Sequence, residues 1–364
     1  MVITATAAAQ TSCIISIDEL FELGISHSLQ VQGSQTNVVM ADENLADKNN
    51  NKYPDLNVGV SGGYIGEPSI FESGLSNLTH LDMPDWSQHY NVELIQPIYQ
   101  GGRIKYSIEK AALQKNIAEL NVERDISEIK LLLIGKYLDL LRLYQQQKLI
   151  ETSIEQARQR LHDIRGFERN GMVTSSDVLR SELQLSTYEL SLDQTKNDIS
   201  IISTQLDVAL GMDEEMLIVP QNDLLERSGA TFSYDSCIEM AYQHYPELKI
   251  AKLYIEMAKA DRQIVKADFL PKFSLKAGNT LLRPITSSSP AIDKYANNWS
   301  IDLTLSYSLS SIYHNKHKMN VARQSIILQD IQYRQMIQNI INNVKANYIK
   351  HNESLKRVET LTIS

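Results

Sequence analysis

The sequence predicts a mostly helical fold that also contains β-strands, and three observations lead to this prediction. Long segments without proline carry apolar residues at helical spacing, and shorter segments alternate between apolar and polar residues. The same order of segments also occurs twice along the chain of 364 residues. We therefore expect long antiparallel α-helical hairpins together with four β-strands.

The first fifteen residues read differently from the rest of the chain. Residues 1–9 are small and apolar, and Ala7, Ala8 and Ala9 resemble the end of a secretory signal, although no basic region precedes them. We expect residues 1–15 to be the remnant of a signal peptide or a disordered terminus. Cys13 offers a thiol for lipid attachment, but the residues before it fit such a signal poorly. With Cys237 far away in sequence, we expect two isolated thiols.

A helix and two strands follow. Residues 16–51 read as a helix that Ser16 and Glu19 can cap. Residues 55–64 then alternate, which places Leu56, Val58 and Val60 on one face of a strand. A loop rich in glycine, serine and proline leads to a second alternating segment that begins near Trp86.

Residues 101–211 read as two long helices joined at one tight tip. The ascending helix spans about residues 103–168, and at about 1.5 Å per residue it would be about 90 Å long. Asn170 and Gly171 tolerate positive φ and can end it. Thr174 or Ser175 can cap the descending helix, which ends at Gly211.

The arrangement then repeats at one constant offset in residue number, so that Ser233 corresponds to Ser16 and Pro271 to Pro54. After a loop that changes the offset slightly, Trp299 repeats Trp86, and a helix without proline or glycine runs from near Tyr313 to the last residue. We expect a first structural repeat over residues 16–232 and a second over residues 233–364. Because the second repeat stops within its long helix, we expect a truncated chain that assembles poorly.

Composition and motifs argue against several classes of function. The net charge of −9 disfavours a nucleic-acid binder, and no run of 18 apolar residues predicts a transmembrane helix. His314 and His317 have a spacing that can bind a metal but usually does not. No catalytic set or phosphate-binding loop is recognisable. We expect no enzyme, no cofactor and no metal.

The strands have the length of tilted membrane strands, about 9 to 11 residues. Four strands are too few to close a barrel, whereas three chains with four strands each would close one of twelve. Aromatic residues near the strand ends would suit the two membrane interfaces, although such residues favour any strand. These candidates are Tyr64, Trp86, Trp299 and Tyr307, with Tyr90 also along a strand.

Three segments resemble those of the TolC-type outer membrane efflux proteins. They are residues 95–103, with Pro97, Gly101 and Gly102, the tip at residues 171–179, and residues 206–211, which end at Gly211. The resemblance implies a homotrimer with one joint twelve-stranded barrel in the outer membrane and an α-helical tunnel in the periplasm. It implies a channel of a tripartite efflux or type I secretion system, whose pump selects drugs, metals or proteins as cargo.

The resemblance also assigns roles at the tip. Gly171, Met172, Val173 and Thr174 would contact a periplasmic adaptor (membrane fusion) protein, which connects the channel to an inner-membrane RND or ABC pump. Asp177 matches an aspartate that helps to hold neighbouring hairpins closed, and plain helix capping explains it equally well. The rival interpretation is a soluble periplasmic coiled-coil adaptor or a structural rod. The duplicated strand pairs favour the channel, because neither rival needs them.

Overall fold

The computed structural model describes residues 12–67, 69–71, 74, 76, 79–80, 83–213, 216–221, 232–287 and 291–363. These residues divide into two compact units, which cut across the two sequence repeats. The first unit takes the described residues of Met1–Asn37 and Glu119–Met240. The second takes those of Val38–Ala118 and Ala241–Ser364.

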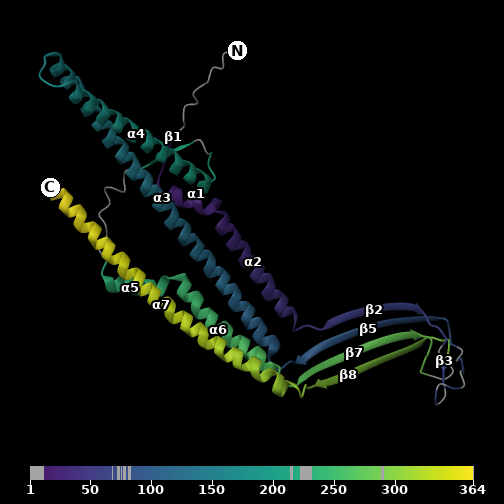
Figure 1. Cartoon of the computed structure of the whole chain (residues 1–364). Coiled ribbons are helices and arrows are strands. Elements are labelled where there is room, and N and C mark those ends of the chain that lie inside the picture. The colour runs from purple at the N-terminus through teal and green to yellow at the C-terminus, as the bar shows by residue number, and fades with distance from the viewer. Residues whose placement is uncertain are drawn as a thin grey trace, which may run out of the picture. The chain divides into compact units, whose positions relative to one another are not determined.

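The first unit contains the helical hairpin and a small parallel sheet (Figure 1). Helices α3 (Arg103–Arg169) and α4 (Ser175–Leu210) form the hairpin, and α1 (Ile17–His27) packs beside it. Strands β1 (Ser12–Ile15) and β6 (Leu217–Pro220) pair in parallel. Together these elements enclose the core, in which Leu20, Leu133, Tyr137, Leu206, Leu210 and Ile218 are fully or almost fully buried.

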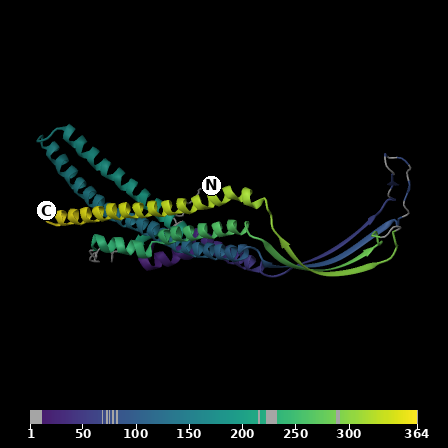
Figure 2. The ribbon, with the colours of Figure 1, turned by 90° about the horizontal axis from the view of Figure 1, so that it is seen from below.

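The second unit carries a four-stranded antiparallel sheet. Its strands are β2 (Asp55–Tyr64), β5 (Trp86–Tyr99), β7 (Lys272–Arg283) and β8 (Ala296–Ser306), in that order across the sheet. Figure 2 shows the four strands running side by side. A short pair, β3 (Ser69–Ile70) and β4 (Thr79–His80), lies in the loop between β2 and β5.

The remaining helices are α2 (Leu29–Asn50), α5 (Tyr234–His244), α6 (Pro246–Ala267) and α7 (Ser311–Ile363). Within the second unit the side-by-side order of the helices follows the order of the strands to which they connect. Lys115 of α3 pairs with Asp42 of α2, and Lys110 of α3 pairs with Asp261 of α6, each at 2.7 Å. Helix α6 in turn contacts α7. The helices α2, α3, α6 and α7 therefore lie side by side in the same order as the strands β2, β5, β7 and β8.

The turn from β5 into α3 requires glycine at position 101. Gly101 has φ +65°, and a Cβ there would lie 2.7 Å from the carbonyl oxygen of Ala267 at the end of α6. Both the conformation and the close approach of the backbone require glycine. The Gly-Gly pair noted in the sequence is thus a packing feature of this junction.

The predicted helix over residues 16–51 is in fact two helices. Ser28 has an extended backbone and its Oγ accepts a hydrogen bond from the N–H of Val31, so that it starts α2 afresh. Residues 12–15 form β1, although the sequence placed them in the leading segment, because β6 supplies a partner strand. The other residues of that segment lie outside the described residues.

The repeat is visible in the element boundaries. At the offset that relates Ser233 to Ser16, both ends of α5 and α6 coincide with those of α1 and α2. At the same offset Lys272, the first residue of β7, corresponds to Asp55, the first residue of β2. Over these segments the elements of the two halves therefore begin and end at matching positions. No described helix contains an 18-residue stretch that is apolar enough to cross a membrane.

Candidate functional site

The four-stranded sheet has one apolar and one polar face. The register sets Val58 of β2 opposite Val92 of β5, and Leu275 of β7 opposite Leu303 of β8. Because side chains alternate along a strand, one face collects apolar residues from all four strands. They are Leu56, Val58, Val60, Tyr64, Trp86, Tyr90, Val92, Leu94, Leu275, Ala277, Leu281, Trp299, Ile301, Leu303 and Leu305.

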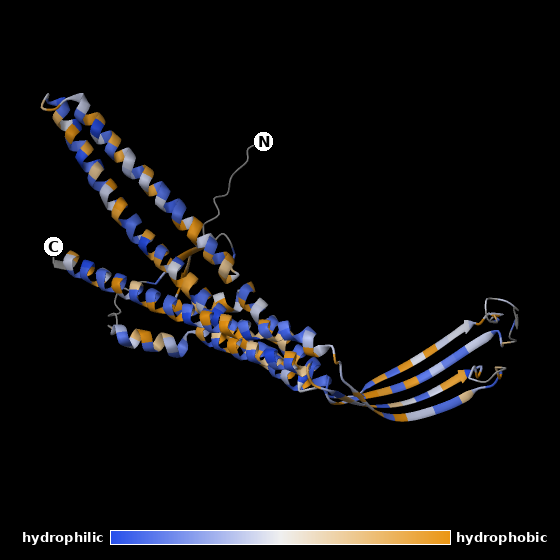
Figure 3. Ribbon diagram, turned by 60° about the horizontal axis from the view of Figure 1, so that its bottom comes forward, coloured by the Kyte–Doolittle hydropathy of each residue, from blue (hydrophilic) through white to orange (hydrophobic). Residues whose placement is uncertain are grey.

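Within the described chain nothing covers the middle of this apolar face. Val60 is 71% exposed and Leu303 is 67% exposed, which is far from the burial that such residues have in a protein core. Figure 3 shows the apolar and polar bands that alternate along the strands. An exposed apolar area of this extent marks a surface that contacts another protein or lipid.

The opposite face is polar. Glu93 of β5 and Lys276 of β7 are diagonal neighbours with 3.9 Å between their charged groups, and Ser300 donates a hydrogen bond to Asp302 along β8. Gly59 leaves space for the side chain of Asn91, whose Oδ1 would lie 2.2 Å from a Cβ at that position. A sheet with an apolar face outward and a polar face inward is the pattern of strands that span a bilayer.

Aromatic residues gather at both ends of the sheet. Tyr64 ends β2 and Trp86 begins β5, and their rings meet edge to face at 6.1 Å. Trp299 is the fourth residue of β8, nearer the same loop-bearing end, whereas Tyr307 follows β8 at the end that joins the helices. Of the predicted aromatic candidates, the structure therefore brings Tyr64 and Trp86 into direct contact.

Two further aromatic residues were not predicted from the sequence. Tyr99 and Phe273 pair across β5 and β7 at the helix-bearing end, with ring centroids 6.3 Å apart. Tyr99 stands directly before the Gln100-Gly101-Gly102 turn, and that position at a strand end was the signal that could have identified it.

The hairpin tip is built by local hydrogen bonds. The N–H of Met172 donates to the carbonyl of Phe167, and Gly171 takes a positive φ of +73°. Gly171, Met172 and Thr174 are exposed, whereas Val173 is half-buried. The structure thus places the four residues assigned to adaptor contact on one continuous turn.

Asp177 caps α4. Its Oδ2 accepts hydrogen bonds from the N–H of Thr174 at 3.0 Å and from the hydroxyl of Thr174 at 2.7 Å. These two hydrogen bonds, the hydroxyl bond first, hold the pKa of Asp177 below its ordinary value. Capping therefore accounts for Asp177 within one chain, and its role between hairpins stays a prediction.

Ion pairs join the two helices of the hairpin. Arg165 pairs with Glu182 at 2.7 Å and Arg158 pairs with Glu189 at 3.0 Å, so that each bridge links α3 to α4. Both pairs are solvent-exposed and contribute little to stability singly, at about 0 to 1 kcal/mol. They identify residues that lie opposite each other across the hairpin.

One buried carboxyl was not anticipated. Asp207 of α4 is fully buried, and among the described residues neither of its carboxylate oxygens has a hydrogen-bond partner. Burial, and next the negative charge of Asp213, raise the pKa of Asp207 to about 6. Its position within the family-like segment 206–211 gave no sign of burial, because aspartate is normally exposed.

The structure gathers no set of metal ligands. Among the described residues no group of three or more histidine, cysteine, aspartate or glutamate side chains is arranged to hold a metal ion. His314 and His317 both lie on α7, and His314 faces a pocket at the start of that helix. Cys13 in β1 and Cys237 in α5 are both free thiols.

Comparisons with known proteins agree on one fold. Residues 237–362 match the family model described as "Outer membrane efflux protein". No curated protein matches the chain by sequence. The outer-membrane channel OprN has a TM-score of 0.76 and 16% identity over 95% of this chain and 76% of its own.

Two further solved structures are similar. VceC, an outer membrane protein of Vibrio cholerae, has a TM-score of 0.72 and 14% identity over 94% of this chain and 82% of its own. CusC has a TM-score of 0.70 and 14% identity over 99% of this chain and 80% of its own. At such identities the likeness establishes the fold. The matched family consists of outer-membrane channels, which are not enzymes. Residues 237–362 are thus similar to the outer membrane efflux protein family, and the chain as a whole has the fold of the TolC-like outer-membrane channels.

Proposed function

We propose that the protein is the outer-membrane channel of a tripartite efflux or type I secretion system. Its sheet spans the outer membrane, and its helices extend into the periplasm toward an adaptor protein and an inner-membrane pump. The observation that carries the proposal is the two-faced sheet, whose exposed apolar face continues over all four strands. Strands of 10 to 14 residues are long enough to cross a bilayer when tilted.

The open edges of the sheet call for further copies of the chain, and the resemblance to the TolC-type proteins sets their number at three. Strands β2 and β8 lie at its two edges, with no further strand beside either in the described chain. Lipid does not tolerate unpaired backbone groups, so each edge needs the complementary edge of another copy. Three copies, with β8 of one beside β2 of the next, form a closed sheet of twelve strands. The polar face, with Glu93, Lys276 and Asp302, then lines the lumen.

The hairpin tip is the proposed contact with the adaptor. Gly171, Met172 and Thr174 are exposed there, and the turn is held by its own backbone hydrogen bonds. A preformed turn loses little conformational entropy when a partner binds. The soluble adaptor or rod is the weaker alternative, because neither would leave an apolar sheet face of this size in water.

The first test is the native mass of the protein extracted in mild detergent from outer membranes of cells that make it from its own gene. We expect a heat-labile trimer that conducts ions in planar bilayers. A soluble monomer or dimer in the periplasm would contradict the channel and favour the adaptor or rod.

The second test concerns the tip. Replacing Gly171 by Arg and Val173 by Glu should abolish efflux in complementation assays, because bulky charges would block the contact surface. Trimer abundance in the membrane should not change. Thr152→Lys, which adds a charge on an exposed part of α3 away from the tip, is the matched control. Continued efflux by the tip variant would show that the adaptor docks elsewhere.

A further inference from the structure

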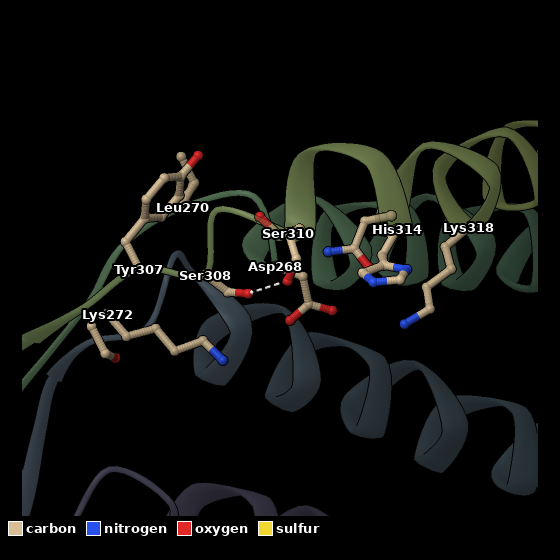
Figure 4. Close-up of a pocket in the computed structure, with 11 residues that line it drawn as sticks. Asp268, Leu270, Lys272, Tyr307, Ser308, Ser310, His314 and Lys318 are labelled. Atoms are coloured by element: carbon tan, nitrogen blue, oxygen red, sulfur yellow. Dashed lines mark hydrogen bonds between the residues drawn. The ribbon is translucent and has the colours of Figure 1, made fainter.

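A pocket of about 570 Å³ lies where β8 passes into α7. Its walls come from the start of β7, the end of β8, the linking residues and the first two turns of α7 (Figure 4). All of these residues belong to the second compact unit. The volume falls within the usual range of small-molecule sites, about 300 to 1,000 Å³.

Two lysines give the pocket a positive charge. Figure 4 shows Lys272 and Lys318 extending toward its middle from opposite sides, with Asp268 and His314 between them. Asp268 forms an ion pair with Arg103, which compensates its negative charge. Within the described chain neither lysine forms an ion pair, so both ammonium groups are available to an anion.

Hydroxyl groups line the same pocket. The Oγ atoms of Ser308 and Ser310 lie 2.9 Å apart. Ser311 is only 6% exposed, and its buried Oγ has no hydrogen-bond partner in the part of the chain that the structure describes. A buried hydroxyl without a partner costs free energy, and a ligand that accepts its hydrogen bond would recover that cost. Ser311 is also the first residue of α7, whose N-terminal end carries a partial positive charge.

The corresponding junction in the first repeat lacks the serine hydroxyls. Helix α3 begins with Arg103 where α7 begins with Ser311, and Arg103 pairs with Asp268. The pocket at that first junction, of about 440 Å³, also has two lysines in its lining, Lys52 and Lys105, but no serine lines it and most of its other side chains are apolar. The combination of lysine and serine is therefore a property of the second junction and not of strand-to-helix junctions in general.

We propose that this pocket binds a phosphate group. A phosphate oxygen accepts charge-assisted hydrogen bonds from lysine and further hydrogen bonds from serine hydroxyls. A phospholipid headgroup and free phosphate both carry this group. An acyl chain of a lipid would contact the exposed side chain of Tyr307, which continues the apolar face of β8. Lys272 and Ser306 lie instead on the polar face with Lys276, where free phosphate in the lumen of the proposed channel would reach them. The choice between the two sources rests on the proposed membrane position of the sheet, whereas the phosphate chemistry does not.

The test uses the delipidated protein in dodecyl maltoside, a detergent without phosphate. Three probes are compared by equilibrium dialysis: inorganic phosphate, dihexanoyl-phosphatidylglycerol below its micelle concentration, and dihexanoyl-glycerol, which lacks phosphate. We expect inorganic phosphate and the phospholipid to bind and dihexanoyl-glycerol not to bind, and tighter binding of the phospholipid would identify the lipid as the source. Lys272→Gln and Lys318→Gln should each weaken phospholipid binding about tenfold, because each removes a charged hydrogen bond.

Lys316→Gln is the control, since it removes the same charge from the same helix at a residue that does not line the pocket. Equal binding of inorganic phosphate and the phospholipid, both weakened by the two pocket variants, would support the site with free phosphate as its ligand. Absence of binding by either, or binding that Lys272→Gln and Lys318→Gln leave unchanged, would overturn the proposal. Trimer mass and conductance, measured on the same samples, separate that failure from a failure of the proposed channel.

Discussion

At the scale of single residues, Tyr137 ties the small parallel sheet to the hairpin. Its hydroxyl donates to the carbonyl of Ile15 at 2.9 Å and accepts from the N–H of Gln221 at 2.8 Å. The side chain is fully buried, so no water can replace these bonds. One hydroxyl therefore satisfies two backbone groups, the carbonyl of the last residue of β1 and the N–H of the residue that follows β6.

Tyr137→Phe should destabilise the protein by about 1 to 3 kcal/mol, because two buried backbone groups lose their partner. Thermal unfolding followed by circular dichroism would measure the change. Tyr144→Phe on the same helix is the control, since the Tyr144 hydroxyl forms no hydrogen bond within the described chain although burial raises its pKa. Equal losses in both variants would refute the role given to the Tyr137 hydroxyl.

Asp207 should make stability depend on pH. Because its pKa is raised to about 6 from the ordinary 3.8, the folded state binds the proton more strongly than the unfolded state. Stability should be highest below about pH 4, fall as the pH rises toward 6, and level off above it. The full difference is about 3 kcal/mol.

Asp207→Asn should remove this slope and raise the melting temperature at pH 7.5, with little effect at pH 4. Asp198→Asn, at an exposed position of the same helix, should change neither. Melting curves of both variants at pH 4 and pH 7.5 would measure these changes. A pH slope that persists in Asp207→Asn would assign the dependence to another group.

At the scale of elements, the long helices and the four main strands could be predicted because their patterns extend over many residues. The strands β1 and β6 could not, since four residues are too few for a periodic signal and their pairing joins positions about 200 residues apart. The break between α1 and α2 at Ser28 has no proline or glycine to mark it in the sequence. Its counterpart in the second repeat, Tyr245, is followed by Pro246, so a closer comparison of the repeats would have revealed it.

For the apolar face of the sheet, the pattern within each strand could be predicted from the sequence, but the pairing between strands could not. The alternation placed Leu56, Val58 and Val60 on one face, and the structure confirms it. The sequence could not give the register between strands, which is what joins those residues to Ile301 and Leu303 in one surface. It also could not reveal the pocket at Ser311, because that pocket depends on which side chains fill a junction.

Two glycines with positive φ should respond differently to alanine. A Cβ at Gly101 would meet the backbone of Ala267, whereas a Cβ at Gly171 would meet no atom within 4 Å. Gly171→Ala should therefore cost only the conformational penalty of about 1 to 2 kcal/mol. Gly101→Ala should cost more, measured as a larger drop in melting temperature. Equal drops would show that the junction adjusts to the added methyl group.

At the scale of the whole molecule, the direction in which a side chain leaves β8 should decide whether a charge is tolerated. Ile301→Arg puts a cation on the apolar face, at a cost of about 2 to 4 kcal/mol per copy near the middle of a bilayer. Ser300→Arg puts the same cation on the polar face, beside Asp302. We expect only Ile301→Arg to reduce the heat-labile trimer in outer-membrane fractions. Equal loss in both variants would speak against a lipid-facing surface.

The edges formed by β2 and β8 have a consequence for how cells make the protein. Until its neighbours arrive, each copy exposes two unpaired strands next to an apolar face, and this combination promotes aggregation. For the channel proposed above, we therefore expect a newly exported copy to need a holding chaperone until its edges are paired, and biogenesis to limit the yield more than the stability of the finished assembly does.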